Sequence, residues 1–250
     1  MAYREYLPHP SLRKHVACYW TRSPELNGTA GRHEVLPDGC IDILFRVLPK
    51  GDTAQGSVIG TMKTPILVPS SSTEFVAVRF RPGGAVPFLR VPAWELTDSS
   101  FSLDHFWGER VLKLQERLQS LEAEARVRLL EAELLKRLGV VEAPDQTIAY
   151  LVKQTAEWPE LPGVVGLAGA VGVSRRQLER KFLNTVGVGP KTFLRVVRLQ
   201  RAVIQMKHRT IQSWADFAME AGYYDQAHLN RDFKMLTLQT PKKYLQSIAR

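Results

Sequence analysis

Arginine and amide side chains recur at two places in the last third of the chain, in positions that one helix face would share. Arg176 and Arg180 stand four residues apart, and Asn230 and Arg231 occupy the corresponding place about fifty residues later. Guanidinium and amide groups form the paired hydrogen bonds that distinguish base edges in a major groove. Since a single exposed arginine is usually only solvated, the surrounding pattern has to decide what these residues do.

That pattern is an internal repeat. The segment 167–182 carries L-A-x-x-x-G followed by L-x-x-x-F, and the segment 217–233 carries F-A-x-x-x-G followed by L-x-x-x-F. A small alanine lets two helices approach closely, and a glycine four residues later permits a tight turn. At about 100° per residue, the next helix buries its Leu and Phe and turns the arginines outward. The repeat therefore predicts two helix-turn-helix units.

The excess positive charge lies in the same third of the chain. The net charge is +9; residues 163–250 contain 15 Lys/Arg against 5 Asp/Glu, whereas residues 1–162 contain 19 against 20. A neutral part joined to a basic part indicates a module that binds a polyanion. Charge alone would suit a membrane surface as well as nucleic acid.

Around these residues the sequence resembles the AraC/XylS family of bacterial transcription regulators. The segment 222–233, GYYDQAHLNRDF, is similar to the family's signature around its second recognition helix, and 172–182, GVSRRQLERKF, is similar to the first. GVGP at 187–190 is similar to the turn that follows. The resemblance covers about a hundred residues. It implies an all-α double helix-turn-helix domain over 145–250, with a long helix at Pro190–Met206 joining the two units.

Carried over position by position, the resemblance also implies the DNA contacts. Ser174 would cap the first recognition helix, and Thr210 would lie where the family contacts phosphate. Glu179 would either accept from a cytosine amino group or orient Arg176 and Arg180, and His228 would contact DNA or lie at the rim. The predicted DNA-binding residues are Ser174, Arg175, Arg176, Glu179, Arg180, Thr210, Gln226, Ala227, His228, Asn230 and Arg231.

The second unit differs from the first in two features. Tyr223 and Tyr224 are expected to pack rather than to contact a partner. After the second recognition helix the family pattern has Gly, but this chain has Leu238. A left-handed leucine would cost about 1–2 kcal/mol, and the alternative is a rebuilt turn.

The first eighty residues predict antiparallel strands. Apolar residues alternate along Cys40–Val47 and Glu74–Phe80, which is typical of half-buried strands. Turn residues at 37–39 suggest that His33–Leu36 forms a hairpin with Cys40–Val47. Loops are expected at Pro49–Gly56 and Pro69–Thr73. The interpretation is a small antiparallel β-barrel or sandwich, and we adopt the barrel.

From about residue 103 the apolar period changes to that of helices. Helices are predicted at Leu103–Leu118 and Glu122–Leu138 with a break at Ser120, then a linker at Gly139–Pro144 and a helix at Asp145–Trp158. The Leu-rich pair is expected to pack on the barrel and to share in a dimer contact. The fold class is therefore α+β, with one domain at 1–139 and a second at 145–250.

The N-terminal part carries a weaker resemblance. LPDGCID at 36–42 and VRFRPG at 78–83 are similar to the barrel domain that precedes the DNA-binding part in a subset of the family. Such domains sense a small molecule, dimerise, or both. Neither motif dictates a ligand.

The other residues of this part that could bind a metal or act in catalysis also have simple structural explanations. Cys18, Cys40, His15 and His33 lack the spacing of metal ligands, and Asp38 and Asp42 suit a turn and a strand edge better than catalysis. The tryptophans at 20, 94 and 107 are either core residues or the lining of a ligand pocket. No cofactor is expected.

The sequence thus predicts a transcription regulator that binds double-stranded DNA. Its other expected partners are a small-molecule effector, a second copy of the chain and, for an activator, RNA polymerase. Because neither a secretory signal nor a membrane span is evident, the cytoplasm is the expected location. Two other functions fit the sequence less well. An enzyme fused to a DNA-binding tail would need a metal-bound or reactive cysteine motif. An architectural DNA-binding protein would account for the basic charge but not for two repeats with the same spacing of buried residues.

Overall fold

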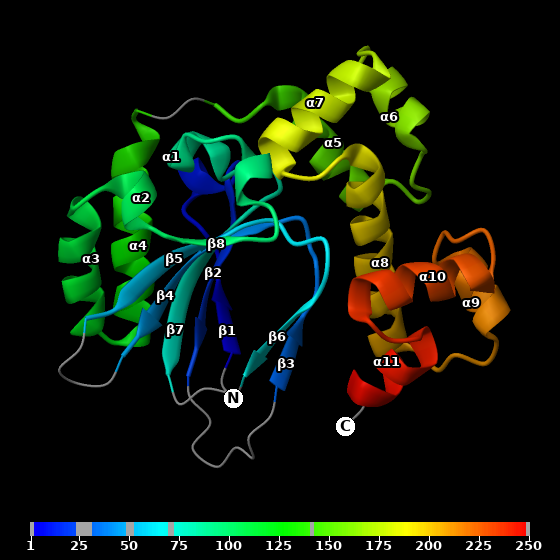
Figure 1. The fold of residues 1–250 in the computed structure, drawn as a ribbon, viewed down its shortest axis with the longest axis horizontal. Helices are drawn as coiled ribbons and strands as arrows, with labels where there is room; N and C mark the ends of the chain where they lie inside the picture. The colour runs from blue at the N-terminus through cyan, green and yellow to red at the C-terminus, as the bar shows by residue number, and fades with distance from the viewer. Residues whose placement is uncertain (1–2, 24–31, 49–52, 70–72, 141–142, 249–250) are drawn as a thin grey trace.

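The computed structural model describes residues 3–23, 32–48, 53–69, 73–140 and 143–248. Its N-terminal part is built on antiparallel strands (Figure 1). Six of them form one sheet in the order β1-β2-β7-β4-β5-β8, and β3 and β6 pair separately. The strands are β1 (Tyr3–Tyr6), β2 (Val16–Arg22), β3 (Arg32–Val35), β4 (Ile41–Val47), β5 (Gln55–Ile59), β6 (Ile66–Pro69), β7 (Glu74–Phe80) and β8 (Ser100–Ser102).

The predicted antiparallel sheet is confirmed, but it is not a closed barrel. Among the described residues β1 and β8 are the edges of the large sheet and do not pair with each other. The predicted hairpin between His33–Leu36 and Cys40–Val47 is wrong, because β3 pairs with β6 while β4 pairs with β5 and β7. The turn at Gly39, where φ is 79°, passes the chain from one sheet to the other.

The alternation of apolar residues works as expected. Ile41, Ile43 and Phe45 on β4, and Val76 and Phe80 on β7, are all buried. They meet α3 (Arg110–Gln119) and α4 (Ala123–Leu138), which bury their own apolar faces in the same core and lie to the left of the sheet in Figure 1. Shorter elements complete this part: η1 (Pro10–Leu12), α1 (Val86–Leu89), η2 (Ala93–Leu96) and α2 (Asp104–Trp107).

Several boundaries differ from the predicted ones. The single helix expected at Leu103–Leu118 is two, because Gly108 takes a left-handed φ of 66° between α2 and α3. Ser120 ends α3 as predicted. Gly56 belongs to β5 and Pro69 to β6, so the two predicted loops are shorter where they are described. The predicted linker at Gly139–Pro144 includes positions 141–142, which lie outside the described residues.

The C-terminal part is helical around two apolar cores. One core gathers residues of α5, α6, α7 and the start of α8, and the other gathers the rest of α8 with α9, α10 and α11. The helix bounds are α5 (Gln146–Glu157), α6 (Val164–Ala170), α7 (Arg175–Val186), α8 (Pro190–His208), α9 (Trp214–Glu220), α10 (Gln226–Thr237) and α11 (Pro241–Ile248). Within the ranges given above, no helix has the length and apolarity needed to cross a membrane.

Candidate nucleic-acid interface

The first unit consists of α6, a tight turn and α7. Gly172 turns the chain with φ of 66°. The Ser174 hydroxyl accepts a hydrogen bond from the Gln177 backbone at 3.2 Å, and the Gln177 side chain accepts one from the Ser174 backbone at 2.9 Å. This reciprocal cap satisfies two backbone donors that a helix start leaves free. Leu178 and Phe182 are fully buried, so the sequence pattern has fixed which face of α7 points outward.

The outward face of α7 is cationic and unpaired. Arg175, Arg176, Glu179 and Arg180 are all exposed, and within the described part of the chain none of them forms an ion pair. Glu179 therefore does not orient the two arginines through a salt bridge. Its carboxylate lies at the α7–α8 turn instead, where a β-carbon on Gly189 would come within 2.3 Å of Oε1.

The second unit repeats this construction with α9 and α10. Gly222 has φ of 79°, and the Asp225 carboxylate caps α10 by accepting from the His228 backbone at 2.6 Å. Leu229 and Phe233 are fully buried. The two helix-turn-helix units predicted from the repeat are thus both present.

The outward face of α10 is less charged than that of α7. Gln226, Ala227 and Arg231 are exposed, and Asn230 is half-buried. His228 packs at the rim: its Nδ1 lies 3.4 Å from the Tyr224 backbone nitrogen, and its ring centroid is 5.2 Å from that of Tyr223. These contacts orient the His228 ring within the unit, and its contact with DNA stays a prediction.

The two tyrosines that precede α10 differ. Tyr223 is buried as expected, with the Arg198 guanidinium 5.3 Å from its ring centroid. Tyr224 is 88% exposed, so the expectation that it packs is wrong. The turn at Gly222 points consecutive side chains in opposite directions, and only one of them can reach the core.

Asp232 is a structural residue that the sequence reasoning missed. It is buried on α10 and accepts from Arg195 Nε at 2.9 Å and Nη2 at 2.7 Å, and its other oxygen lies 3.7 Å from Arg198. Both arginines belong to α8, so the carboxylate fastens the second recognition helix to the helix that joins the units. Its spacing of three residues from buried Leu229 was the available signal.

The joining helix is longer than predicted, at Pro190–His208 rather than Pro190–Met206. Arg201 on α8 donates to the Thr155 and Trp158 carbonyls at 2.6 Å, which closes the C-terminal end of α5. Thr210 is exposed in the connection from α8 to α9. Apart from Thr210, the predicted contact residues lie on the two recognition helices, with Ser174 as the cap of α7.

The N-terminal part packs against the first unit. Thr61 Oγ1 donates to the Val186 carbonyl at 2.6 Å, and Thr97 Oγ1 donates to the Gly187 carbonyl at 2.8 Å. Both carbonyls belong to the C-terminal end of α7, which lacks intrahelical donors. A β-carbon on Gly187 would come within 2.7 Å of Thr97 Oγ1, so this close approach requires glycine.

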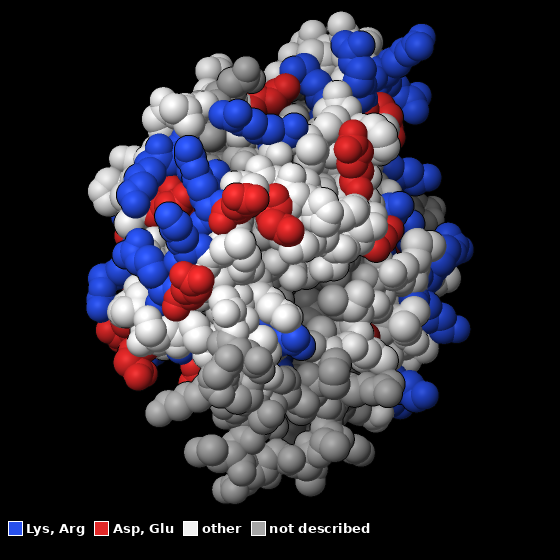
Figure 2. All heavy atoms as spheres, turned by 60° about the vertical axis from the view of Figure 1, so that its left-hand side comes forward, with Lys and Arg blue, Asp and Glu red and all other residues white. Residues whose placement is uncertain are grey.

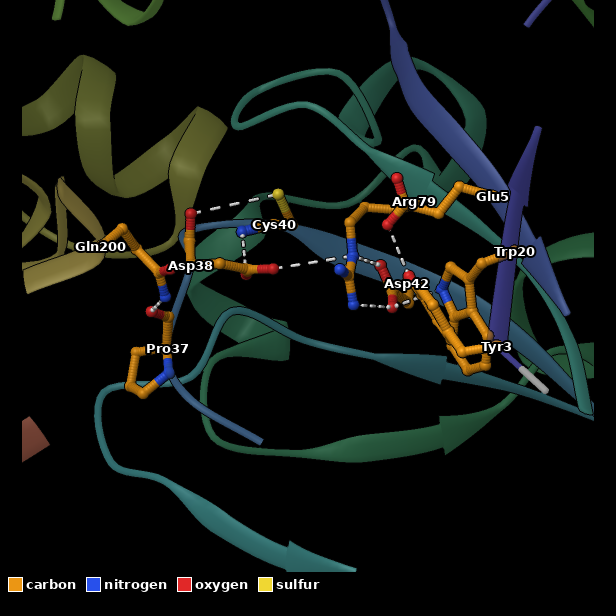
Figure 3. Close-up of polar contacts among 9 residues, drawn as sticks. All are labelled: Tyr3, Glu5, Trp20, Pro37, Asp38, Cys40, Asp42, Arg79 and Gln200. Atoms are coloured by element: carbon orange, nitrogen blue, oxygen red, sulfur yellow. Dashed lines mark hydrogen bonds and ion pairs between the residues drawn. The ribbon is translucent and has the colours of Figure 1, made fainter. Parts of the chain in front are cut away.

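The LPDG segment also touches the joining helix (Figure 3). Gln200 Nε2 donates to the Pro37 carbonyl at 2.6 Å. Gly39 lies so near α8 that a β-carbon there would come within 3.2 Å of the Phe193 ring. The two N-terminal motifs meet at this place, because Arg79 of VRFRPG pairs with Asp42 at 3.0 Å and with Asp38 at 3.6 Å.

This cluster is structural rather than reactive. Burial raises the pKa of Asp42 above its ordinary value, although Arg79 opposes the shift. Burial and the neighbouring carboxylates raise the pKa of the Cys40 thiol, and burial raises that of Cys18 to about 11. Thiols with raised pKa values are poor nucleophiles. Among the described residues no group of three His, Cys, Asp or Glu is placed to hold a metal ion.

Two known domain families match the chain. Residues 167–247 match a helix-turn-helix domain, and residues 4–102 match a domain of unknown function (DUF6597). Together with the two capped units, the first match identifies the C-terminal part as an AraC-type helix-turn-helix domain.

Curated relatives resemble only part of the chain. The HTH-type transcriptional regulator MtrA of Neisseria gonorrhoeae is 28% identical over 101 residues, which cover 40% of this chain and 33% of MtrA. An uncharacterized HTH-type transcriptional regulator of Staphylococcus aureus strain MSSA476 is 36% identical over 78 residues, covering 31% of this chain and 10% of that protein. The chain thus spans a third or less of the length of these relatives.

Solved structures give weaker likenesses. ToxT of Vibrio cholerae is similar at a TM-score of 0.44 and 11% identity, with 98% of each chain covered. The DNA-binding domain of AdpA, solved in complex with a target DNA, is similar at a TM-score of 0.38 and 21% identity, covering 41% of this chain and 92% of that one. Because both scores lie below 0.5, neither likeness supports a functional conclusion.

Proposed function

We propose that the chain is a sequence-specific DNA-binding transcription regulator whose helices α7 and α10 enter successive major grooves of duplex DNA. The observation that carries this proposal is the pair of capped helices, each with a buried Leu and Phe; α7 exposes three arginines and α10 exposes Arg231, and none of the four forms an ion pair with a described residue. The domain division that we propose with it is 1–139 and 145–250.

The joining helix supports the proposed geometry. Helix α8 has 19 residues, which span about 28 Å at 1.5 Å per residue. Successive major grooves on one face of B-DNA are about 34 Å apart. A helix of this length, fastened to α5 by Arg201 and to α10 by Asp232, can hold two recognition helices near that spacing without a flexible linker.

Binding-site selection on a randomised duplex tests this proposal. Arg180→Ala should relax base preference in one segment, and Arg231→Ala in a second segment about 10 bp away, each by about 1–3 kcal/mol of discrimination. Lys191→Ala and Lys242→Ala are the matched controls, because exposed lysines beside the recognition helices should contact phosphate only. They should weaken binding to all sequences and flatten its salt dependence.

Two outcomes would contradict the proposal. If both arginine variants altered the same base pairs, the two-groove arrangement would be wrong. If the wild-type chain bound selected and random duplexes with equal affinity, it would be an architectural binder, because specific regulators discriminate by about 10³-fold or more.

The remaining roles extend this proposal. We place the chain in the cytoplasm, treat it as a regulator rather than an enzyme, and assign effector sensing and self-association to its N-terminal part. A second copy would raise affinity by holding two DNA-binding parts at high effective concentration. Light scattering at micromolar concentration, with and without DNA, would show a dimer. RNA polymerase is the further partner if the protein activates transcription.

A further inference from the structure

A basic cavity lies among α1, α2, α3 and α4. It encloses about 590 Å³. Its floor is apolar, since Phe88, Trp107 and Leu114 are buried and Phe106 is half-buried. Figure 2, which brings this side of the molecule forward, shows Lys and Arg side chains gathered there. The charged residues that line the cavity are Arg90, Arg110, Lys113, Arg117, Lys136, Arg137 and Glu133.

The cavity holds far more positive than negative charge. Its single carboxylate, Glu133, accepts from Arg137 Nε at 2.9 Å and lies 3.9 Å from Lys136 Nζ. The other four cations form no ion pair within the described part of the chain. Arg110, Lys113 and Arg117 share one face of α3 at spacings of three and four, where like charges repel. A bound anion would relieve this repulsion.

Two of these cations occupy positions that local preference disfavours. Arg110 is the first residue of α3, where the helix dipole opposes a positive charge. Arg90 follows α1 with a left-handed φ of 59°, which is uncommon for any residue other than glycine. Lys136 and Arg137, in contrast, suit the last turn of α4. Helix stability therefore explains the positions of Lys136 and Arg137 but not those of Arg110 and Arg90.

Arg137 is held ready for a ligand. Its guanidinium carbon lies 3.8 Å from the centroid of the Trp107 ring, and Trp107 is itself fixed by donating to the Phe88 carbonyl at 3.1 Å. Burial lowers the pKa of Arg137, and the charges of Arg110 and Arg90 lower it further, while Glu133 opposes them. With Nε bound to Glu133, its terminal nitrogens have no partner in the described residues. An oxyanion would complete that fork.

We infer that this cavity binds an organic phosphate of nucleotide size, with the phosphates against the cations of α3 and α4 and a flat apolar group on the aromatic floor. The volume falls within the roughly 300–1,000 Å³ of small-molecule sites. Arginine forks match phosphate geometry.

The cavity borders the helix-turn-helix part. Arg90 and Val140 also line a neighbouring cavity, whose other walls include Asp145 and Thr185. Asp145 caps α5 and accepts from Lys181 of α7 at 2.6 Å. Thr185 belongs to α7, so a ligand that draws in Arg90 would act on the wall of a cavity that α7 also lines. The role of this cavity as the effector site rests on the proposed function, but the binding of an organic phosphate in the cavity does not.

Isothermal titration of the full-length chain with ADP, inorganic pyrophosphate and adenosine, at fixed ionic strength and without DNA, tests the site. ADP should bind most tightly, because only ADP supplies both phosphates and a ring. Lys113→Ala/Arg117→Ala should weaken ADP binding at least tenfold and slightly raise the Tm of the unliganded chain, since it removes like charges. Arg128→Ala, an exposed cation elsewhere on α4, is the matched control and should bind ADP like the wild type.

Three results would overturn the inference. If neither ADP nor pyrophosphate bound to the chain at millimolar concentration, the site would be excluded. Equal affinity for ADP and pyrophosphate would show that the aromatic residues of the cavity do not contact the ligand. Loss of ADP binding in Arg176→Ala/Arg180→Ala, with Lys113→Ala/Arg117→Ala unaffected, would move the anion to the recognition helix. Because DNA is absent throughout, these failures are distinct from failure of DNA recognition.

Discussion

Leu238 shows how one side chain can be strained without being needed for packing. It ends α10 with φ of 57° and ψ of 8°, and it is 67% exposed. Of the two alternatives that the sequence left open, the structure shows the left-handed turn rather than a rebuilt one. An exposed leucine there bears the steric cost of its β-carbon and returns little burial.

Leu238→Gly should therefore stabilise the chain. Relief of about 1–2 kcal/mol of left-handed strain is partly offset by the greater freedom of glycine in the unfolded chain. A net gain of about 1 kcal/mol corresponds to a rise in Tm of roughly 2–4 °C for a chain of this size. Leu238→Ala is the control, because it keeps the β-carbon and so the strain. A lower Tm for the glycine variant would show that Leu238 packs against something.

Asp232 offers the opposite case, a charge whose removal should be costly. Its side chain is 3% exposed, whereas that of Glu220, which pairs with Arg209, is 55% exposed. Asp232→Ala should lower the free energy of unfolding by about 3–5 kcal/mol, because it leaves Arg195 and Arg198 half-buried and unpaired. Glu220→Ala should cost less than about 1 kcal/mol. Urea denaturation measures both, and equal losses would refute the anchoring role of Asp232.

At the scale of elements, periodicity predicted most of what is local. The alternation in β4 and β7 located both strands, and the Leu-rich periods located α3 and α4. The repeat located α7 and α10 together with their outward residues. These predictions succeeded because burial of one face dictates a period of 2 or 3.6 whatever the partner is.

The remaining errors concern contacts between distant segments. The turn residues around Gly39 predicted a hairpin between β3 and β4, but β3 pairs with β6. A local sequence pattern does not show which distant strand a strand will pair with. The break at Gly108 was not predicted, because its positive φ of 66° leaves no sign in the spacing of apolar residues. The role of Asp232 depends on arginines more than thirty residues away, so only its buried position was open to prediction.

The junction between η2 and α7 is the element contact most open to test. Thr61→Val and Thr97→Val keep the side-chain shape but leave the carbonyls of Val186 and Gly187 without these donors. Each should lower the free energy of unfolding by about 1–3 kcal/mol and lower hydrogen-exchange protection near Val188. Thr185→Val is the control, since its hydroxyl donates within α7 to Lys181 at 2.6 Å. If the control cost as much as the other two, the junction would not depend on these bonds.

At the scale of the whole molecule, the chain joins a basic helical part to a near-neutral sheet part through a tight interface. Phe193, at 2% exposure, lies against Gly39, and Leu36 packs on the core that α8 shares with α10. The C-terminal part nevertheless has two apolar cores of its own. Its independence is therefore a matter of degree that can be measured.

A fragment beginning at Asp145 should fold and bind the DNA sites selected by the full chain, because both cores, both recognition helices and the excess positive charge lie within it. Its Tm should be lower than that of the full chain, since Phe193 and the α7 carbonyls lose their cover. A fragment of residues 1–139 should fold and bind no DNA. Circular dichroism and duplex titration at matched salt measure both fragments. Equal DNA affinity for the two would refute the division of roles, and an unfolded C-terminal fragment would mean that the sheet part is needed to complete its core.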